Sequence, residues 1–193
     1  MEILGQGYYY HIYNRGNNKE KLFIEHEDYL FFLELFRKYI HDVANIYCFC
    51  LIPNHFHFLI RIREQGEITS YDLRRKPFYQ SFSNYFNAYT KYFNNKYRRT
   101  GSLFQKNFRR KRIDNEIYLK YLIHYIHTNP VHHEISEDFR QYKYSSYNEI
   151  LNGHPTILER EIVIDLFEDA DNYIYTHKQK ARVVFIRNFI KGD

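Results

Sequence analysis

The order of extended and helical hydrophobic patterns over residues 7–128 most constrains the fold of this chain. Residues 7–14 (GYYYHIYN) are rich in β-forming types and end in the turn-like segment 15–18 (RGNN). Residues 45–52 are a short apolar run. After a Pro-Asn break, residues 55–63 (HFHFLIRIR) alternate as a strand with one covered face does. These last two segments predict an antiparallel pair.

Helical patterns lie between the predicted strands. Residues 28–41 have the length and apolar density of a helix, and residues 115–128 return to helical periodicity. We expect the second of these helices to stop before the Asn-Pro pair at 129–130. Between Ser81 and Tyr97, aromatic residues recur every three or four positions, with Ser81 placed to cap the N-terminus. We expect this aromatic stripe to face the core.

With residues 107–113 as a fourth strand, the order is strand, helix, strand, strand, helix, strand. This order predicts an α+β, ferredoxin-like fold, which is a four-stranded antiparallel sheet with helices on one face. Residues 159–167 and 172–190 also look helical. We therefore predict a main domain over residues 1–150 and a helical C-terminal extension over residues 151–193.

Composition narrows the class of protein. Hydrophobic residues make up 44% and charged residues 26%, as in folded globular proteins. The longest apolar run, residues 46–52, is far shorter than the roughly 20 residues that cross a membrane, and the first residues have no signal-peptide layout. We expect a cytoplasmic protein without a membrane partner. The two cysteines, Cys48 and Cys50, cannot build a disulfide framework.

Positive charge is concentrated in one stretch of the chain. The formal net charge is +5, yet residues 73–113 contain twelve Lys or Arg and no Asp or Glu. The other residues include 16 basic and 23 acidic side chains, a charge of −7. An acid-free stretch of this length is typical of a surface that binds phosphate groups, although a solvated basic face has the same pattern.

Two pairs of residues have spacings that suit metal-assisted chemistry. His55 and His57 are two apart on a predicted strand, so both rings point to one face and can converge on a cation. Tyr125 and Asn129 are four apart and share one face if the helix persists to Asn129. A phenol beside a divalent metal can attack a phosphate that the metal polarises. Spacing alone is equally compatible with ordinary polar and packing roles for all four residues.

Together with their neighbours, these residues resemble a known family. The segments that carry the resemblance are His11-Ile-Tyr-Asn-Arg-Gly-Asn-Asn18, Leu22-Phe23, Pro53-Asn54-His55-Phe56-His57, Gly101-Ser-Leu-Phe-Gln105, Tyr125-Ile-His-Thr-Asn-Pro-Val131 and Ser145-Ser146-Tyr147. In this order, over roughly residues 7–150, the chain resembles the REP-associated tyrosine transposases, which are HUH single-tyrosine transposases.

The resemblance implies a metal-dependent endonuclease and strand transferase that cleaves single-stranded DNA, often folded into a hairpin. It implies that Tyr125 is the nucleophile, which becomes joined to the 5′ phosphate. It also implies that His55, His57 and Asn129 hold Mg²⁺ or Mn²⁺. Two imidazoles are softer donors than Mg²⁺ prefers, so Mn²⁺ fits at least as well.

A transposase of this kind is expected to work on the nucleoid as a monomer or a homodimer. We expect its DNA contacts among the cations of the acid-free stretch and of the first loop. These are Arg15, Lys96, Arg98, Arg99, Arg109, Arg110 and Arg112.

Two non-catalytic classes of protein remain compatible with the same residues. If the turn after residue 52 is tight, Cys50 lies opposite His57, and these two with Cys48 and His55 could form a Cys2His2 zinc site in a nucleic-acid-binding module. The other class is a ferredoxin-like RNA-binding domain with aromatic residues on its strands.

Overall fold

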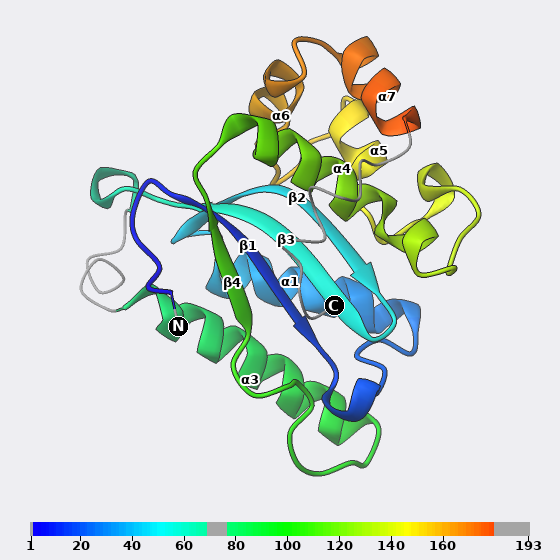
Figure 1. The fold of residues 1–193 in the computed structure, drawn as a ribbon. Coiled ribbons are helices and arrows are strands. Elements are labelled where there is room, and N and C mark those ends of the chain that lie inside the picture. The colour runs from blue at the N-terminus through cyan, green and yellow to red at the C-terminus, as the bar shows by residue number, and fades with distance from the viewer. Residues whose placement is uncertain (1, 69–76, 180–193) are drawn as a thin grey trace.

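The computed structural model describes residues 2–68 and 77–179 (Figure 1). Its four strands form one antiparallel sheet in the order β2-β3-β1-β4. The strands are β1 (Tyr9–Arg15), β2 (Ala44–Ile52), β3 (His55–Ile62) and β4 (Arg109–Ile113). The long helices are α1 (His26–Tyr39), α3 (Phe78–Lys96) and α4 (Glu116–His132). The predicted ferredoxin-like α+β class is confirmed.

The strand register decides which side chains share a face of the sheet. Tyr13 on β1 pairs with His57 on β3 and with Arg109 on β4, and Arg15 pairs with His55. Because side chains alternate along a strand, these five residues point to one face of the sheet. The residues between them point to the opposite face.

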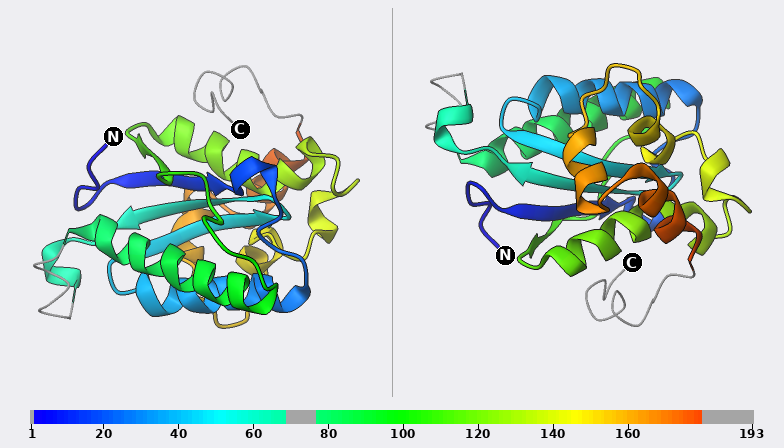
Figure 2. Two further views of the ribbon diagram at one scale, coloured as in Figure 1. Left: turned by 90° about the horizontal axis from the view of Figure 1, so that it is seen from below. Right: turned by 90° about the horizontal axis from the view of Figure 1, so that it is seen from above.

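Helices α1 and α3 cover that opposite face (Figure 2). An aromatic core fills the space between, in which the ring of Phe32 on α1 lies 4.8 Å from that of Tyr85 on α3 and 5.1 Å from that of Phe56 on β3. The predicted aromatic stripe is therefore core. The helix that carries the stripe, α3, begins at Phe78, and Pro77 is its N-cap residue. The predicted cap at Ser81 is therefore wrong, and Ser81 is a buried residue within the helix.

Asp28 joins α1 to α3 through hydrogen bonds and an ion pair. Its carboxylate is fully buried and accepts hydrogen bonds from the backbone N–H groups of Ile24 and Glu25, the Tyr97 hydroxyl and the Lys96 ammonium, at 2.7–2.9 Å. Burial raises the pKa of this carboxyl, but the hydrogen bonds outweigh burial and hold the pKa below its usual range. The Asp28 carboxylate is thus ionised and fully engaged at neutral pH.

Helix α4 lies on the other face of the sheet, against β2 and β3 (Figure 2). It continues through Pro130 to His132, so the stop predicted before the Asn-Pro pair is wrong. A proline near the end removes only its own N–H, and the His133 N–H still donates to the Asn129 carbonyl at 3.1 Å. Asn129 therefore stays on the helix, one turn after Tyr125. In the described part of the chain, no helix is long and apolar enough to span a membrane.

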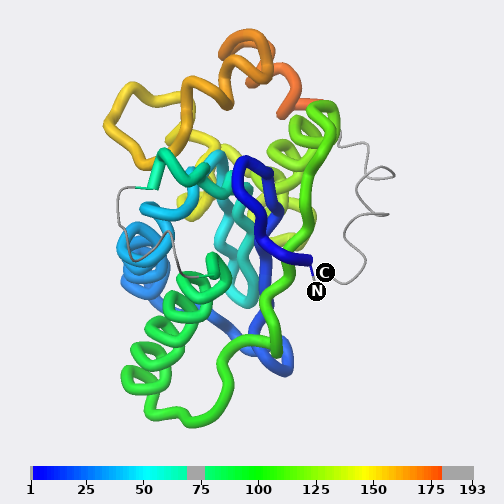
Figure 3. Tube along the Cα trace, turned by 90° about the vertical axis from the view of Figure 1, so that its left-hand side faces the viewer, coloured from blue at the N-terminus to red at the C-terminus, as the bar shows by residue number. Residues whose placement is uncertain are grey.

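Residues 144–178 pack along the outer edge of β2 (Figure 3). They comprise α5 (Tyr147–Leu151), at the end of the predicted main domain, and α6 (Arg160–Leu166) and α7 (Ala170–Lys178), in the predicted extension. The Glu159 N–H donates to the Ile46 carbonyl at 2.8 Å, and the Leu51 N–H donates to the Tyr144 carbonyl at 2.9 Å. The helix predicted at 159–167 is confirmed. The helix predicted at 172–190 begins earlier, at Ala170, and ends at Lys178, because Gln179 is extended; residues 180–190 of that prediction lie outside the described residues.

Candidate active site

His55 and His57 lie side by side at the start of β3. Their ring centroids are 5.1 Å apart, the rings are nearly perpendicular, and both side chains are buried. Nδ1 of His55 is 2.8 Å from the amide oxygen of Asn54, and Nδ1 of His57 is 2.9 Å from Nε2 of His11. In the described part of the chain, neither Nε2 atom has a hydrogen-bond partner. Each ring therefore offers one nitrogen to a ligand.

Asn129 supplies a third donor. Its side chain is fully buried, and within the described residues neither its oxygen nor its nitrogen makes a hydrogen bond. A buried amide left without partners costs roughly 1–3 kcal/mol, so its retention needs an explanation. The amide lies close enough to the His55 ring to affect its pKa. The Asn129 oxygen and the two Nε2 atoms form a mixed nitrogen and oxygen donor set that fits a divalent metal ion such as Mn²⁺.

Burial keeps both imidazoles neutral. It lowers the pKa of His55 to about 3, with smaller contributions from His133 and Arg15. Burial also lowers the pKa of His57 well below its ordinary value, with further contributions from His55 and His11. Neutral imidazole is the form that binds a metal ion. Both rings are therefore in the ligand form at neutral pH without first losing a proton.

Tyr125 lies against this pair from α4. Its ring centroid is 5.7 Å from that of His57, edge to face, and on another side His132 stacks on it at 5.8 Å. The side chain is half-buried. Sheet and helix thus bring together the three predicted metal ligands and the predicted nucleophile, although more than sixty residues separate them in the chain.

Two histidines of the site were not predicted to take part. His11, on β1, contacts Nδ1 of His57, and burial together with the charge of Lys111 lowers the pKa of His11 to about 3. His11 is therefore a neutral partner for His57. The ring of His133, just after α4, lies 4.5 Å from that of His55. His11 belongs to the first of the segments that carry the family resemblance, but only the β1–β3 register reveals its contact with His57.

Comparison with known proteins identifies the family and supports the fold. Residues 6–129 match the family model described as IS200-like transposase. The chain belongs to the IS200-like transposase family. This membership confirms the resemblance drawn from the motifs and favours a transposase over an RNA-binding domain. A solved structure of a REP-associated tyrosine transposase bound to a REP hairpin is similar in fold, with a TM-score of 0.59 and 18% identity over 81% of this chain and 87% of that chain. Comparison with curated proteins gives no match.

Two of the predicted DNA-contacting cations of this IS200-like transposase flank the site. Arg15, the last residue of β1, is close enough to His55 to lower its pKa, and its buried Nε has no hydrogen-bond partner in the described chain. Arg109 is exposed at the start of β4, on the same face as His57. Arg98 is exposed after α3 with a positive φ of 49°.

The other predicted cations have partners within the transposase. Lys96 lies 2.9 Å from both Glu25 and Asp28. Arg99 pairs with Glu20 at 2.7 Å, Arg112 pairs with Asp114 at 2.5 Å, and Arg110 donates to the Glu2 carbonyl. The ammonium of Lys96 in particular is neutralised by the carboxylates of Glu25 and Asp28, and this pairing joins α3 to the start of α1.

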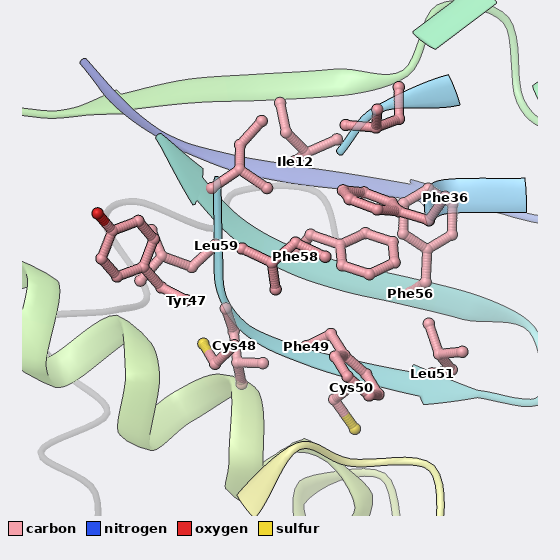
Figure 4. Packing of buried hydrophobic residues seen from close by; sticks show 14 of the residues in the cluster. Ile12, Phe36, Tyr47, Cys48, Phe49, Cys50, Leu51, Phe56, Phe58 and Leu59 are labelled. Atoms are coloured by element: carbon pink, nitrogen blue, oxygen red, sulfur yellow. The ribbon is translucent and has the colours of Figure 1, made fainter. Parts of the chain in front are cut away.

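The cysteines do not join the histidine pair. Cys50 does lie opposite His57 in the β2–β3 register, as expected. Both cysteines belong to the hydrophobic core and lie on the side of β2 that faces α4 (Figure 4). Within residues 2–68 and 77–179, no group of three or more His, Cys, Asp or Glu side chains is arranged to hold a metal, which contradicts the Cys2His2 alternative.

Proposed function

We propose that this IS200-like transposase is a divalent-metal-dependent endonuclease and strand transferase that cleaves single-stranded, hairpin-forming DNA through a covalent 5′-phosphotyrosine. Tyr125 is the nucleophile, and His55, His57 and Asn129 are the metal ligands. One observation carries the proposal. Three buried ligand atoms on two separate elements lack hydrogen-bond partners in the described chain, beside the ring of Tyr125.

The chemistry follows from the residues in place. His55, His57 and Asn129 would hold Mg²⁺ or Mn²⁺, which would supply Lewis-acid polarisation of the scissile phosphate when bound. The Tyr125 oxygen attacks phosphorus, the bond from phosphorus to the 3′ oxygen breaks, and the phenolic proton is balanced by the one gained at the 3′ hydroxyl. The phosphodiester bond energy is retained in the phosphotyrosine. A second 3′ hydroxyl can therefore reverse the step and join strands without a nucleotide cofactor.

His11 and Asn54 position the ligands in this scheme. Each contacts the Nδ1 of one metal-binding ring, which leaves Nε2 as the ligand atom and fixes the plane of the ring. Arg15 and Arg109 supply positive charge beside the site, where the DNA backbone would approach.

The deciding experiment is a search for the covalent adduct. The full chain is incubated with a pool of single-stranded hairpin DNA and Mn²⁺, then denatured, and the protein is tested for attached DNA. We expect a denaturation-resistant adduct with the wild-type chain and none with Tyr125→Phe. Chelation of the metal should also abolish it.

Tyr121→Phe is the matched control, since Tyr121 is a half-buried tyrosine one turn earlier on the same helix. This variant should form the adduct normally. An adduct that persists in Tyr125→Phe and disappears in Tyr121→Phe would overturn the assignment of the nucleophile, and no adduct with any hairpin in the pool would overturn the proposed reaction.

A further inference from the structure

The ring of Tyr125 contacts two histidines that come from different elements. His57 on β3 meets it edge to face with 5.7 Å between centroids, and His132, the last residue of α4, stacks on it at 5.8 Å with 22° between the ring planes. His57 belongs to the proposed metal site, whereas His132 is not one of the proposed ligands. The contact with His132 therefore needs its own explanation.

His132 reaches Tyr125 because α4 continues past Pro130. Residues seven apart lie on the same face of a helix, about two turns from each other. Aromatic and other long side chains on a helix also lean back towards its N-terminus, so the imidazole of His132 is directed towards Tyr125. A helix that ended before Pro130 would carry His132 off this face. The last turn of α4 thus gives the proposed nucleophile a neighbour on its own helix.

A hydrogen bond with Thr128 orients the imidazole of His132. The Thr128 hydroxyl donates its single proton to the His124 carbonyl at 2.8 Å. It can therefore only accept in its 3.1 Å contact with Nε2 of His132, so this nitrogen carries a proton and donates it. Thr128 is 7% exposed, which shields the bond from competing water. The ring plane of His132 is thus set by a residue one turn earlier on α4.

The other surroundings of His132 leave its ring room to move. The side chain is exposed, and beside it lies a cavity of about 780 Å³ whose lining includes Thr128, Val131 and Phe139. Among the described residues, Thr128 is the one hydrogen-bond partner of the His132 ring. Without this bond the imidazole can turn away from Tyr125 into the cavity. The orientation of His132 therefore depends on Thr128.

We infer that His132 is a positioning residue for Tyr125 and that Thr128 holds His132 in place for this role. The imidazole lies against the phenol ring and opposes its rotation away from His57, so the phenolic oxygen stays beside the proposed metal ligands. Because the rings meet in a stacked arrangement, His132 places the phenol and does not take its proton. This inference rests on the proposed function, since it concerns the nucleophile of that reaction.

The first test measures the rate of adduct formation with the full chain in excess over a pool of hairpin DNA in Mn²⁺. We expect His132→Ala to slow this rate about 10–100-fold, because misplacing a reacting group by about 1 Å can cost 10²-fold. Affinity for the same DNA and for Mn²⁺ should be unchanged. His132→Phe keeps a ring at this position and should recover part of the rate. His154→Ala, which removes an exposed histidine outside α4, is the control and should react like wild type.

Thr128→Val tests the residue that orients His132, since valine keeps the shape of threonine without its hydroxyl. This change should slow adduct formation in the wild-type background and have no further effect in His132→Ala, because both changes act through one contact. Melting temperatures confirm that each variant is folded. A wild-type rate in His132→Ala would overturn the inference, as would equal effects of Thr128→Val in the two backgrounds.

A measurement without DNA separates this inference from the proposed function. A 3-fluorotyrosine placed at position 125 alone reports the surroundings of the phenol by fluorine NMR. We expect its signal in the folded chain to differ from that in the unfolded chain, and Thr128→Val to move it towards the unfolded position although both rings are still present. His154→Ala should leave the signal unchanged.

The two measurements fail independently. An unchanged fluorine signal in Thr128→Val, together with an adduct in the wild-type chain, would remove the positioning role and leave the reaction. A shifted signal in Thr128→Val without any adduct in the wild-type chain would retain the restraint on Tyr125 and remove the reaction.

Discussion

Nε2 of His11 lies 2.9 Å from Nδ1 of His57, and this contact leaves Nε2 of His57 facing the active site. The two rings are stacked at 20°, with 5.1 Å between centroids, and the ring of Tyr13 lies against both, 4.5 Å from that of His11 and 5.9 Å from that of His57. His57 is thus fixed both in rotation and in the nitrogen that it presents.

Replacement of His11 should therefore weaken metal binding without touching a ligand. We expect His11→Phe to reduce Mn²⁺ affinity about 10–100-fold, because loss of such a hydrogen-bond partner usually has this effect, and His11→Gln to recover part of it. Titration followed by electron paramagnetic resonance measures the affinity. His26→Phe, which changes an exposed histidine that contacts Tyr144, should bind like the wild type. Equal affinities for His11→Phe and wild type would show that His57 needs no partner.

We expect the Asn129 side chain to lower the stability of the metal-free protein and to contribute to metal binding. Its buried amide has no hydrogen bond in the described chain, so we expect Asn129→Leu to unfold at the same or higher denaturant concentration than wild type when metal is absent. The same variant should lose the rise in melting temperature that Mn²⁺ gives to wild type, because binding to the folded state alone is stabilising. Calorimetry with and without Mn²⁺ measures both effects. Marked destabilisation of the metal-free variant would contradict this account of the amide.

Asp28 should be among the most sensitive positions for folding. Asp28→Ala leaves two backbone N–H groups and two tyrosine hydroxyls without their acceptor and leaves Lys96 with Glu25 alone, and we expect a loss of about 3–5 kcal/mol in the free energy of unfolding. Glu25→Ala removes an exposed carboxylate from the same lysine and should cost about 1 kcal/mol or less. Urea denaturation compares them, and similar losses for both variants would count against the fastening role of Asp28.

Cations with and without partners should differ in their effect on DNA binding. Arg109→Ala should weaken binding of single-stranded DNA and reduce the salt slope by about 0.7, the value for one phosphate contact on a single strand. Lys96→Met should lower stability but leave that slope unchanged, because Lys96 is held by Glu25 and Asp28. Anisotropy titrations over a range of salt concentrations measure the slopes. A reduced slope in Lys96→Met would restore this residue as a DNA contact.

Acid should destabilise the fold in the absence of metal. Burial lowers the pKa of His11, His55 and His177 to about 3, whereas an unfolded histidine titrates near 6.5. Below 6.5 the unfolded chain therefore binds protons that the folded chain does not. Stability should fall as pH decreases from 6.5 towards 3, by up to about 1.4 kcal/mol per pH unit for each such imidazole.

His177→Gln tests one part of this dependence. His177 is buried and lies 2.9 Å from His127, which links α7 to α4. Its replacement should make the fall in stability between pH 6.5 and 4 shallower, whereas replacement of the exposed His154 by Gln should leave it unchanged. Denaturation curves at several pH values decide, and a slope in His177→Gln as steep as that of wild type would refute the contribution of His177.

The predictable features were those set by local periodicity. Aromatic spacing determines which face of α3 is buried, and the period of two places His55 and His57 on the same face of the sheet. The single covered face predicted for residues 55–63 is wrong, because α4 covers the second face and nearly every side chain of β3 is buried. The position of Asn129 relative to Tyr125 also follows from helix geometry. Pro130 did not end the helix, because only one hydrogen bond is lost at that point and tertiary packing retains the last turn.

Features that depend on strand register or tertiary pairing could not be read from the sequence. The contact of His11 with His57 requires the alignment of β1 with β3, which no local pattern states. Lys96 looks like any other cation of the acid-free stretch until α1 places Asp28 beside it.

The two edge strands of the sheet, β2 and β4, differ in what lies against them. The C-terminal extension caps the backbone of β2, whereas β4, at the other end of the strand order, carries four consecutive cations, Arg109 to Arg112. An open edge ordinarily invites another molecule to add a strand, and like charges on both partners oppose such growth. Under the proposed function, the exposed Arg109 would serve two ends, since the same charge that attracts nucleic acid would oppose edge-to-edge pairing of two copies.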